Sequence, residues 1–211
     1  LTAASALARA NKDDGPHLIY LPEVPFTEEK FIADVKAAMK KYGRCVCAIS
    51  EGIRGKDGVP MGAKFAGGEK DSHGNVQMSG TGALGDALAK VLKQKADVKR
   101  VRADTFGYLQ RSFPGVASWQ DQWEAKGAGW CAVLGSLLAK ARGICSGTIG
   151  IERKKTKKYG VNFVYRPIAD AAKYTRSVPK EYIAKNGHDV TQAFIDYAKP
   201  IVGDLPKCEI F

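Results

Sequence analysis

The first residue that could do chemistry is a lone carboxylate, Glu23, which follows the short apolar run 17–22 directly. Pro22 and Pro25 flank it and restrict its backbone. In a parallel α/β sheet, ligands bind outside the carboxyl ends of the strands. A carboxylate fixed at such an end can accept hydrogen bonds from the hydroxyl groups of a sugar. The alternative role for Glu23 is the start of a helix.

Two arginines and a tyrosine surround the end of a second predicted strand, residues 98–105. Arg102, Tyr108 and Arg111 stand close together in the sequence there. The planar guanidinium group of arginine matches phosphate oxygens with paired hydrogen bonds. The group therefore predicts a phosphate site, and surface ion pairs are the alternative role for the arginines.

A strand, a helix and a second strand are expected to position Glu23. The run 17–22 predicts a buried strand that ends at proline. A helix follows over about 28–42, with Thr27 as its cap, acidic residues in its first turn, basic residues in its last turn and Gly43 at its end. The apolar run 44–50 predicts the second strand. This order indicates a βαβ unit with a parallel sheet.

The rest of the chain is predicted to mix helices, strands and one long loop. Residues 52–85 are rich in glycine and polar residues, which is typical of a functional or mobile segment. A helix is expected from about Asp86. The remaining predicted elements are the strand 98–105, a helix over about 118–138 that two glycines could break at 127–129, a β-hairpin of 148–153 and 161–166, and a last helix capped by Asp189.

Gly80, Gly82 and Gly85 fit the G-x-G-x-x-G pattern of dinucleotide-binding proteins, and Asp104 follows near the distance of a ribose-binding carboxylate. The pattern requires a strand directly before it, whereas the preceding residues 71–78 are polar and contain glycine. A loop that leads into a helix is therefore the favoured interpretation. A nucleotide-binding oxidoreductase is the alternative enzyme.

The chain of 211 residues carries a formal net charge of +11, which favours an anionic partner such as nucleic acid, acidic lipid or a phosphorylated metabolite. The basic run 153–158 could contact RNA, but such surfaces normally interleave aromatic residues with the charges. Only Tyr159 is nearby, so a solvated loop is favoured and a basic RNA-binding module is the alternative. No apolar run approaches the ~18 residues of a membrane span.

Five cysteines and three histidines show none of the spacings of a metal site. The number of cysteines is odd, and Cys45 and Cys47 stand inside an apolar run. This pattern indicates reduced thiols buried in a cytosolic core rather than a disulfide framework. His17, His73 and His188 are scattered, and each is expected to be structural or exposed.

Taken in order, the motifs resemble the C-terminal half of the 6-phosphofructokinases, most closely their diphosphate-dependent branch. Residues 1–4 are similar to the segment just after that family's Met-Gly-Arg region, and residues 20–26 to its Pro-Glu motif. Residues 50–52 resemble its strand-end loop, and residues 107–111 its sugar-phosphate motif. Tyr108 stands where ATP-dependent bacterial relatives usually carry histidine.

The resemblance implies Mg²⁺-assisted phosphoryl transfer in glycolysis, from diphosphate or ATP to the 1-hydroxyl of fructose 6-phosphate, giving fructose 1,6-bisphosphate. By position, Glu23 would hold sugar hydroxyls. Tyr108 and Arg111 would bind the 6-phosphate, and Gln110 belongs to the same substrate-binding motif. Arg102 would reach the substrate phosphate of a neighbouring subunit, which implies a homo-oligomer. No nucleic acid and no membrane are expected as partners, and the location would be the cytoplasm.

The same resemblance implies an α/β fold, a parallel-sheet, three-layer lobe of the phosphofructokinase fold that is incomplete at its N-terminus. Residues 1–112 would be the rest of the sugar-phosphate lobe, and residues 113–211 would pack back on a missing donor lobe. The loop 52–85 would be a branch-specific insertion. The family's Gly-Gly-Asp loop and Thr-x-Asp motif do not occur here. Catalytic residues, metal ligands and the donor preference are therefore expected upstream of Leu1, and the chain alone should be catalytically silent.

Overall fold

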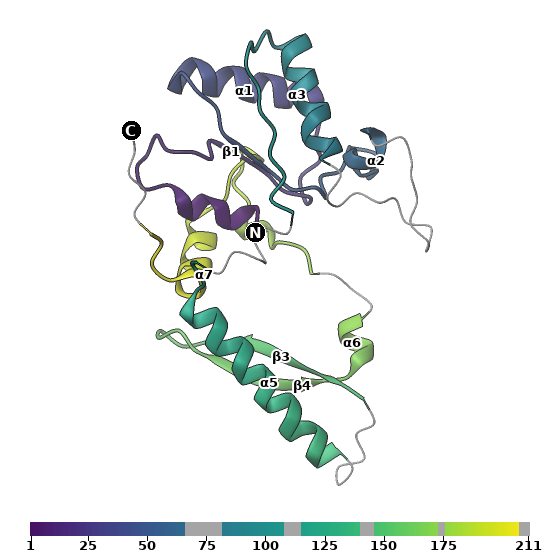
Figure 1. Ribbon diagram of the computed structural model, residues 1–211, viewed down its shortest axis with the longest axis vertical. Helices are drawn as coiled ribbons and strands as arrows, with labels where there is room; N and C mark the ends of the chain where they lie inside the picture. The colour runs from purple at the N-terminus through teal and green to yellow at the C-terminus, as the bar shows by residue number, and fades with distance from the viewer. Residues whose placement is uncertain (66–81, 108–114, 140–145, 173–175, 207–211) are drawn as a thin grey trace. The chain divides into compact units, whose positions relative to one another are not determined.

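The computed structural model describes residues 1–65, 82–107, 115–139, 146–172 and 176–206. The chain divides into two compact units, and Figure 1 labels most of their helices and strands. The first unit comprises residues 1–113 and 178–195, and the second comprises residues 114–177 and 196–211. The chain therefore leaves the first unit near residue 113 and returns to it at residue 178.

The first unit is built around a parallel βαβ arrangement, which confirms the sequence prediction. β1 (Leu18–Tyr20) pairs in parallel with β2 (Cys47–Ile49), and α1 (Glu28–Tyr42) connects them. β1 is buried throughout, whereas β2 is only half-buried. The ordered pairing is shorter than the apolar runs 17–22 and 44–50 that predicted the two strands.

Both ends of α1 lie where the sequence places them. The hydroxyl oxygen of Thr27 accepts a hydrogen bond from the backbone N–H of Lys30 at 3.3 Å, which satisfies a donor of the first turn. Gly43 ends the helix with a left-handed φ of 69°, a conformation that glycine adopts without a steric cost. Phe31 and Val35, which lie about one helical turn apart on α1, are both buried.

The core of the first unit forms between α1, the two strands and α3 (Ala83–Lys95). α3 starts slightly before the predicted Asp86. A short helix, α2 (Met61–Phe65), lies inside the stretch 52–85, which the sequence predicted as a loop. Burying a large apolar side chain stabilises a fold by about 1.5–3 kcal/mol. The buried side chains of this core are Leu18, Tyr20, Phe26, Phe31, Val35, Ile53, Met61, Leu88, Leu92 and Ala96.

The predicted strand 98–105 is wrong, because these residues form no strand in the described part of the chain. Val98 and Val101 pack against the core of the first unit instead. The valines that suggested a strand are therefore accounted for by burial. A strand also needs a neighbour with which to share backbone hydrogen bonds, and none of the described strands pairs with this segment.

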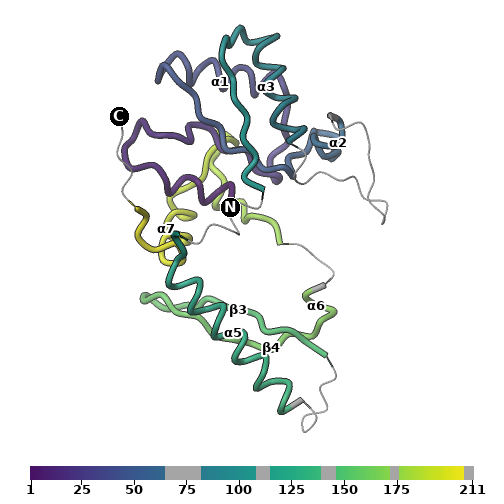
Figure 2. Tube along the Cα trace, viewed as in Figure 1, coloured from purple at the N-terminus to yellow at the C-terminus, as the bar shows by residue number. Residues whose placement is uncertain are grey.

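The second unit contains a long helix on a β-hairpin. β3 (Thr148–Arg153) and β4 (Val161–Arg166) pair antiparallel at the predicted bounds. α5 (Trp119–Ala139) packs on them and runs through residues 127–129 without a break, as the tube in Figure 2 shows. A Cβ on Gly127 would lie 2.4 Å from the ring atom Cζ of Phe163. Glycine is needed there because the helix and β4 approach closely.

The remaining helical segments are short, and one corrects a prediction. η1 (Ala3–Ala8) and η3 (Lys180–Tyr182) are 3₁₀ turns, and α6 (Ile168–Ala172) follows β4. α7 (Gln192–Val202) is not capped by Asp189. No described helix is both long and apolar enough to cross a membrane.

The carboxylate of Asp189 has other partners. It accepts a hydrogen bond from Val190 N at 2.8 Å and pairs with the guanidinium group of Arg9 at 3.0 Å. The carboxylate of Asp189, which the sequence predicted as a helix cap, therefore forms an ion pair with the distant Arg9 instead.

Candidate functional site

The predicted carboxylate Glu23 lies in the loop that follows β1, at the carboxyl end of the sheet. Its Oε1 atom accepts a hydrogen bond from the backbone N–H of Val178 at 2.8 Å. Its Oε2 atom is buried and has no hydrogen-bond partner among the residues that the structure describes. A buried carboxylate oxygen without a donor is energetically costly. Such an atom is therefore a place where a donor from a ligand, such as a hydroxyl group, would be stabilised.

Aromatic packing and backbone hydrogen bonds fix the loop that carries Glu23. The ring of Tyr20 packs edge-on against Phe26 and Phe31, each at 5.5 Å between ring centroids. The backbone N–H of Phe26 donates to the carbonyl of Arg54 at 2.7 Å, and that of Ser50 donates to the carbonyl of Tyr20 at 3.1 Å. These bonds hold the loops after β1 and β2 side by side, so both face the ligand-binding edge expected for a parallel sheet.

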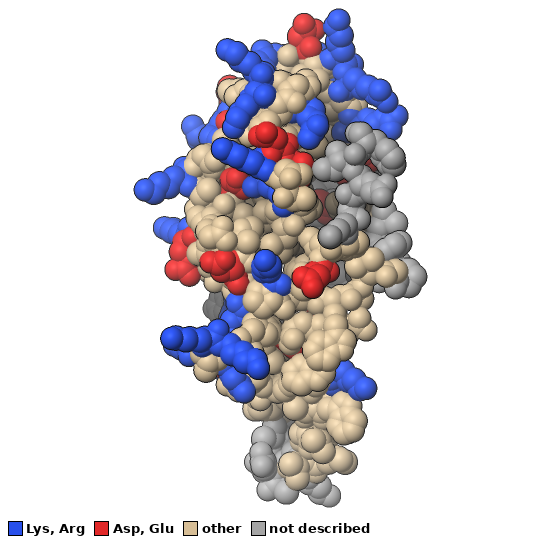
Figure 3. Space-filling view, turned by 90° about the vertical axis from the view of Figure 1, so that its left-hand side faces the viewer, with Lys and Arg blue, Asp and Glu red and all other residues tan. Residues whose placement is uncertain are grey.

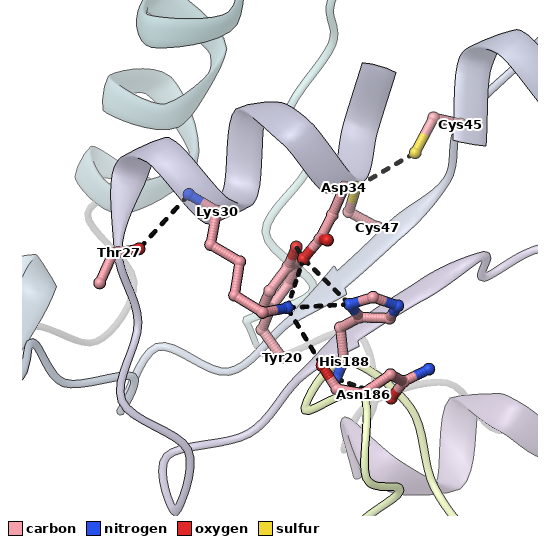
Figure 4. A network of polar contacts seen from close by, with 8 residues as sticks. All are labelled: Tyr20, Thr27, Lys30, Asp34, Cys45, Cys47, Asn186 and His188. Carbon is pink, nitrogen blue, oxygen red and sulfur yellow. Dashed lines mark hydrogen bonds and ion pairs between the residues drawn. The ribbon is translucent and has the colours of Figure 1, made fainter. Parts of the chain in front are cut away.

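Asp34 of α1 forms hydrogen bonds or ion pairs with three side chains (Figure 4). Its Oδ2 atom lies 2.9 Å from the hydroxyl of Tyr20, 2.8 Å from Nζ of Lys30 and 2.9 Å from Nδ1 of His188. Nζ of Lys30 also donates to the carbonyl of Asn186 at 3.1 Å. The cluster therefore ties β1 and α1 to a segment far away in the sequence.

The pKa values follow this arrangement. Burial alone would raise the pKa of Asp34, but the hydrogen bonds from Lys30 and Tyr20 outweigh it and lower the pKa below its ordinary value. Burial raises the pKa of the Tyr20 hydroxyl, and its hydrogen bond to Asp34 raises it further. Asp34 is therefore an ionised acceptor, and Tyr20 is a neutral donor to it.

Residues 178–190, here called the strap, bring the returning chain to Glu23. Ile19 of β1 donates its backbone N–H to the carbonyl of His188 at 2.8 Å. Within the strap, Ile183 and Val190 form an antiparallel bridge. The strap thus lies along β1 and places the amide of Val178 on the candidate carboxylate.

The predicted phosphate group is described only in part. Arg102 is exposed and makes no ion pair or hydrogen bond with any residue that the structure describes. Tyr108, Gln110 and Arg111 lie outside the described residues. The structure therefore brings Glu23 together with the strap, and the assignment of the phosphate-binding residues stays a prediction.

The described residues give no support to the two alternative sites, the glycine pattern 80–85 and the basic run 153–158. Gly82 has a left-handed φ of 68° just before α3, whereas Gly80 and the residues 71–78 lie outside the described part. Of the basic run 153–158, Arg153 ends β3 and residues 154–158 form an exposed turn before β4. The guanidinium group of Arg153 lies over the ring of Tyr159, at 4.7 Å from the centroid.

The described residues provide no metal site. Nowhere among them do three His, Cys, Asp or Glu side chains gather, so they do not fit Mg²⁺. Cys45, Cys47 and Cys131 are free and half-buried, rather than fully buried as predicted, and the other two cysteines lie outside the described part. The sulfur atoms of Cys45 and Cys47 are 3.6 Å apart, and this hydrogen bond and burial raise the pKa of the Cys47 thiol.

Sequence reasoning did not find Val178, Asp34 or His188. The spacing of Lys30 and Asp34, one helical turn apart, does indicate an ion pair on α1. Nothing in the local sequence indicates that His188 joins that pair or that the amide of Val178 reaches Glu23. These contacts join residues that are more than 150 positions apart.

Comparison with known proteins finds relatives that share one name. No protein-family model matches the chain. The pyrophosphate–fructose 6-phosphate 1-phosphotransferase of Rhodospirillum rubrum is 49% identical over 204 residues, which are 96% of this chain and 49% of that protein. The enzyme of the same name from Xanthomonas campestris is 33% identical over 210 residues, covering 98% of this chain and 47% of that protein.

A solved structure agrees with these relatives. The crystal structure of a pyrophosphate-dependent phosphofructokinase from Marinobacter aquaeolei matches with a TM-score of 0.73 and 27% identity, over 99% of this chain and 46% of that one. The chain thus has the α/β phosphofructokinase fold that the motifs predicted, and it spans about half the length of the relatives it matches.

Proposed function

We propose that this chain, a homologue of the C-terminal part of the pyrophosphate-dependent phosphofructokinases, carries the fructose 6-phosphate half of such an enzyme's active site. The complete reaction would transfer a phosphoryl group from diphosphate to the 1-hydroxyl of fructose 6-phosphate. The observation that carries the proposal is Glu23 at the carboxyl edge of the β1–β2 sheet, because its buried Oε2 atom finds no donor in the described part of the chain. A sugar hydroxyl is the donor that this oxygen lacks.

The remaining substrate contacts are proposed from the family motif. Tyr108, Gln110 and Arg111 would bind the 6-phosphate, and Arg102 would reach the phosphate held by a neighbouring subunit. The exposed position of Arg102, without an ion pair in the described part, leaves its guanidinium group free for such a contact. We accordingly propose a homo-oligomer in the cytoplasm.

Residues outside this chain would complete the chemistry. Phosphoryl transfer depends on positioning and on neutralising the charge of the transferred group. Mg²⁺ would be held by residues that are not among those described here, because those do not form a cluster for it. Holding both reactants in place can contribute ~7–11 kcal/mol to lowering a barrier. The sugar half alone therefore binds substrate without turning it over.

The second unit has a surface suited to the complementary half. Large apolar side chains of α5 are exposed, among them Trp119 at 72%, Trp130 at 66% and Leu137 at 72%. The face drawn in Figure 3 shows Lys and Arg mixed with Asp and Glu in its upper part, whereas its lower part carries fewer charged side chains, with Lys and Arg on its left and right. Apolar patches of this kind mark interfaces. We propose that the missing donor lobe covers α5.

A coupled assay for fructose 1,6-bisphosphate tests the proposed function. The 211-residue chain is assayed with fructose 6-phosphate and diphosphate, alone and with the remaining half of the Rhodospirillum rubrum relative added in trans. We expect turnover only with both halves, and its loss with Glu23→Gln. Glu29→Gln, which removes an exposed carboxylate of α1, is the matched control and should retain activity. Turnover by the chain alone at enzyme-like rates would contradict the proposal.

A further inference from the structure

The strap, residues 178–190, does more than add contacts to the first unit. Its first residue, Val178, contacts the carboxylate that is proposed to hold the sugar. Val178 N donates to Oε1 of Glu23 at 2.8 Å, while no described residue contacts Oε2 through a hydrogen bond. One oxygen of the carboxylate is therefore fixed by the protein, and the other is kept for a ligand. The proposed substrate contacts do not explain why a backbone amide from so distant a segment should meet Glu23.

Three contacts hold the strap on the rest of the first unit. The carbonyl of His188 accepts from Ile19 N of β1 at 2.8 Å, and its ring nitrogen Nδ1 lies 2.9 Å from Oδ2 of Asp34. Arg9 pairs with Asp189 at 3.0 Å, and both side chains are about three-quarters buried, with exposures of 24% and 27%. The anchors come from β1, from α1 and from the N-terminal segment, and all three fix the C-terminal end of the strap, at His188 and Asp189.

The strap also packs directly beside Glu23. Gly187 has a left-handed φ of 77°, and a Cβ there would lie only 3.2 Å from Cγ1 of Val24. Glycine therefore lets the turn of the strap approach the residue next to Glu23. The strap thus reaches Glu23 through the amide of Val178 and its neighbour Val24 through Gly187.

We propose that the strap is a positioning element for Glu23, and this inference rests on the proposed function. The amide of Val178 holds Oε1 so that the carboxylate is already oriented when the sugar arrives. A group held in its bound geometry loses less conformational entropy on binding than a free one. Val178 and the strap act through Glu23 and make no contact with the substrate themselves.

The test removes the amide and keeps the side-chain volume similar. Val178→Pro lacks the N–H that Glu23 accepts, whereas Val178→Ala keeps it and is the control. Residue 178 precedes Pro179, which favours the extended backbone that proline also adopts. Isothermal titration of the 211-residue chain measures the affinities for fructose 6-phosphate and for inorganic phosphate.

Ordering one flexible side chain on binding reduces an affinity by up to about tenfold. We therefore expect Val178→Pro to weaken fructose 6-phosphate binding about tenfold, and Val178→Ala to change it little. Inorganic phosphate does not use Glu23 in this account, so its affinity should be unaltered. Equal losses for both ligands would show general damage to the fold and would overturn the inference.

A double-mutant cycle separates positioning from structural support. In a Glu23→Ala background, Val178→Pro should cause no further loss, because the group that it positions is absent. Additive losses would contradict the inference. If Val178→Pro does not fold, Asp34→Asn loosens the strap through His188 and should show the same dependence on Glu23. Asp57→Asn, which breaks the exposed pair with Lys64, is its control.

The outcomes distinguish the two proposals. If Glu23→Ala leaves the affinity for fructose 6-phosphate unchanged, the proposed function of this site is wrong. If Glu23→Ala weakens that affinity while Val178→Pro and Asp34→Asn do not, only the role of the strap is wrong. If Glu23→Ala, Val178→Pro and Asp34→Asn all weaken the affinity for fructose 6-phosphate, and the losses are not additive, both proposals are supported.

Discussion

Replacing Asp34 with asparagine should destabilise the first unit by about 2 kcal/mol. Oδ2 of Asp34 accepts from Tyr20, Lys30 and His188 within 2.8–2.9 Å, and the Asp34 side chain is only 15% exposed. Hydrogen bonds to charged groups contribute about 1.5–3 kcal/mol, against about 0.5–1.5 kcal/mol for neutral ones. Asparagine keeps one acceptor oxygen but loses the charge. Lys30 is 45% exposed and contributes little, so most of the loss comes from Tyr20 and His188.

The effect of Asp34→Asn should depend on pH in a defined direction. The folded protein lowers the pKa of Asp34, so its carboxylate stabilises the fold above the unfolded pKa of about 3.9. That stabilisation is lost as the pH falls through the lower, folded pKa. The difference in stability between wild type and variant should therefore be constant near pH 6–7 and shrink below about pH 4.

The assay must report on the first unit. All three tryptophans, Trp119, Trp123 and Trp130, belong to α5 of the second unit, so tryptophan fluorescence is the wrong probe. Urea unfolding followed by far-UV circular dichroism, together with hydrogen exchange at the Ile19 amide, reports on the strap and β1. Asp57→Asn is the control for a lost surface charge. Equal stability of wild type and Asp34→Asn at pH 7, or a difference that persists unchanged at pH 3, would refute the reasoning.

Three further predictions address other parts of the molecule. Burial and its hydrogen bond to Glu124 raise the pKa of Tyr159 to about 12. Because the pKa of Tyr20 is raised as well, an ultraviolet titration should show at least two late-ionising tyrosines. Glu124→Gln should shift only the ionisation of Tyr159 toward about 10, and an unshifted titration in that variant would exclude the pair. Gly187→Ala should cost about 1–3 kcal/mol of stability in thermal unfolding, because its φ of 77° strains a side chain, and an unchanged melting temperature would show that the turn adapts. Mixing Arg102→Ala and Glu23→Ala subunits of the reconstituted enzyme should restore part of the activity through hybrid sites, and no recovery in hybrids shown to have exchanged would count against shared sites.

The elements whose ends are marked by nearby residues were predicted correctly from the sequence. α1 has a cap, charges that match its dipole and a terminal glycine, so both its ends could be read from the sequence. The hairpin of β3 and β4 likewise has its bounds encoded in two apolar runs and the turn between them. The position of Glu23 at a strand end followed from the βαβ order alone.

Contacts between distant segments could not be predicted in the same way. The segment 98–105 has the composition of a strand, yet packing against the core accounts for its valines. Asp189 has the position of a helix cap, yet a charged partner far away in the chain takes its carboxylate. The strap and its link to Glu23 depend on tertiary pairing, for which the local sequence carries no signal.

The central claim is that the free oxygen of Glu23 accepts a sugar hydroxyl, and calorimetric titration of the 211-residue chain with fructose 6-phosphate tests it most directly. The account predicts saturable binding by wild type. It also predicts binding at least tenfold weaker in Glu23→Gln, because a charge-assisted hydrogen bond becomes a neutral one. Equal affinities for fructose 6-phosphate in wild type and Glu23→Gln, with both proteins folded, would contradict it.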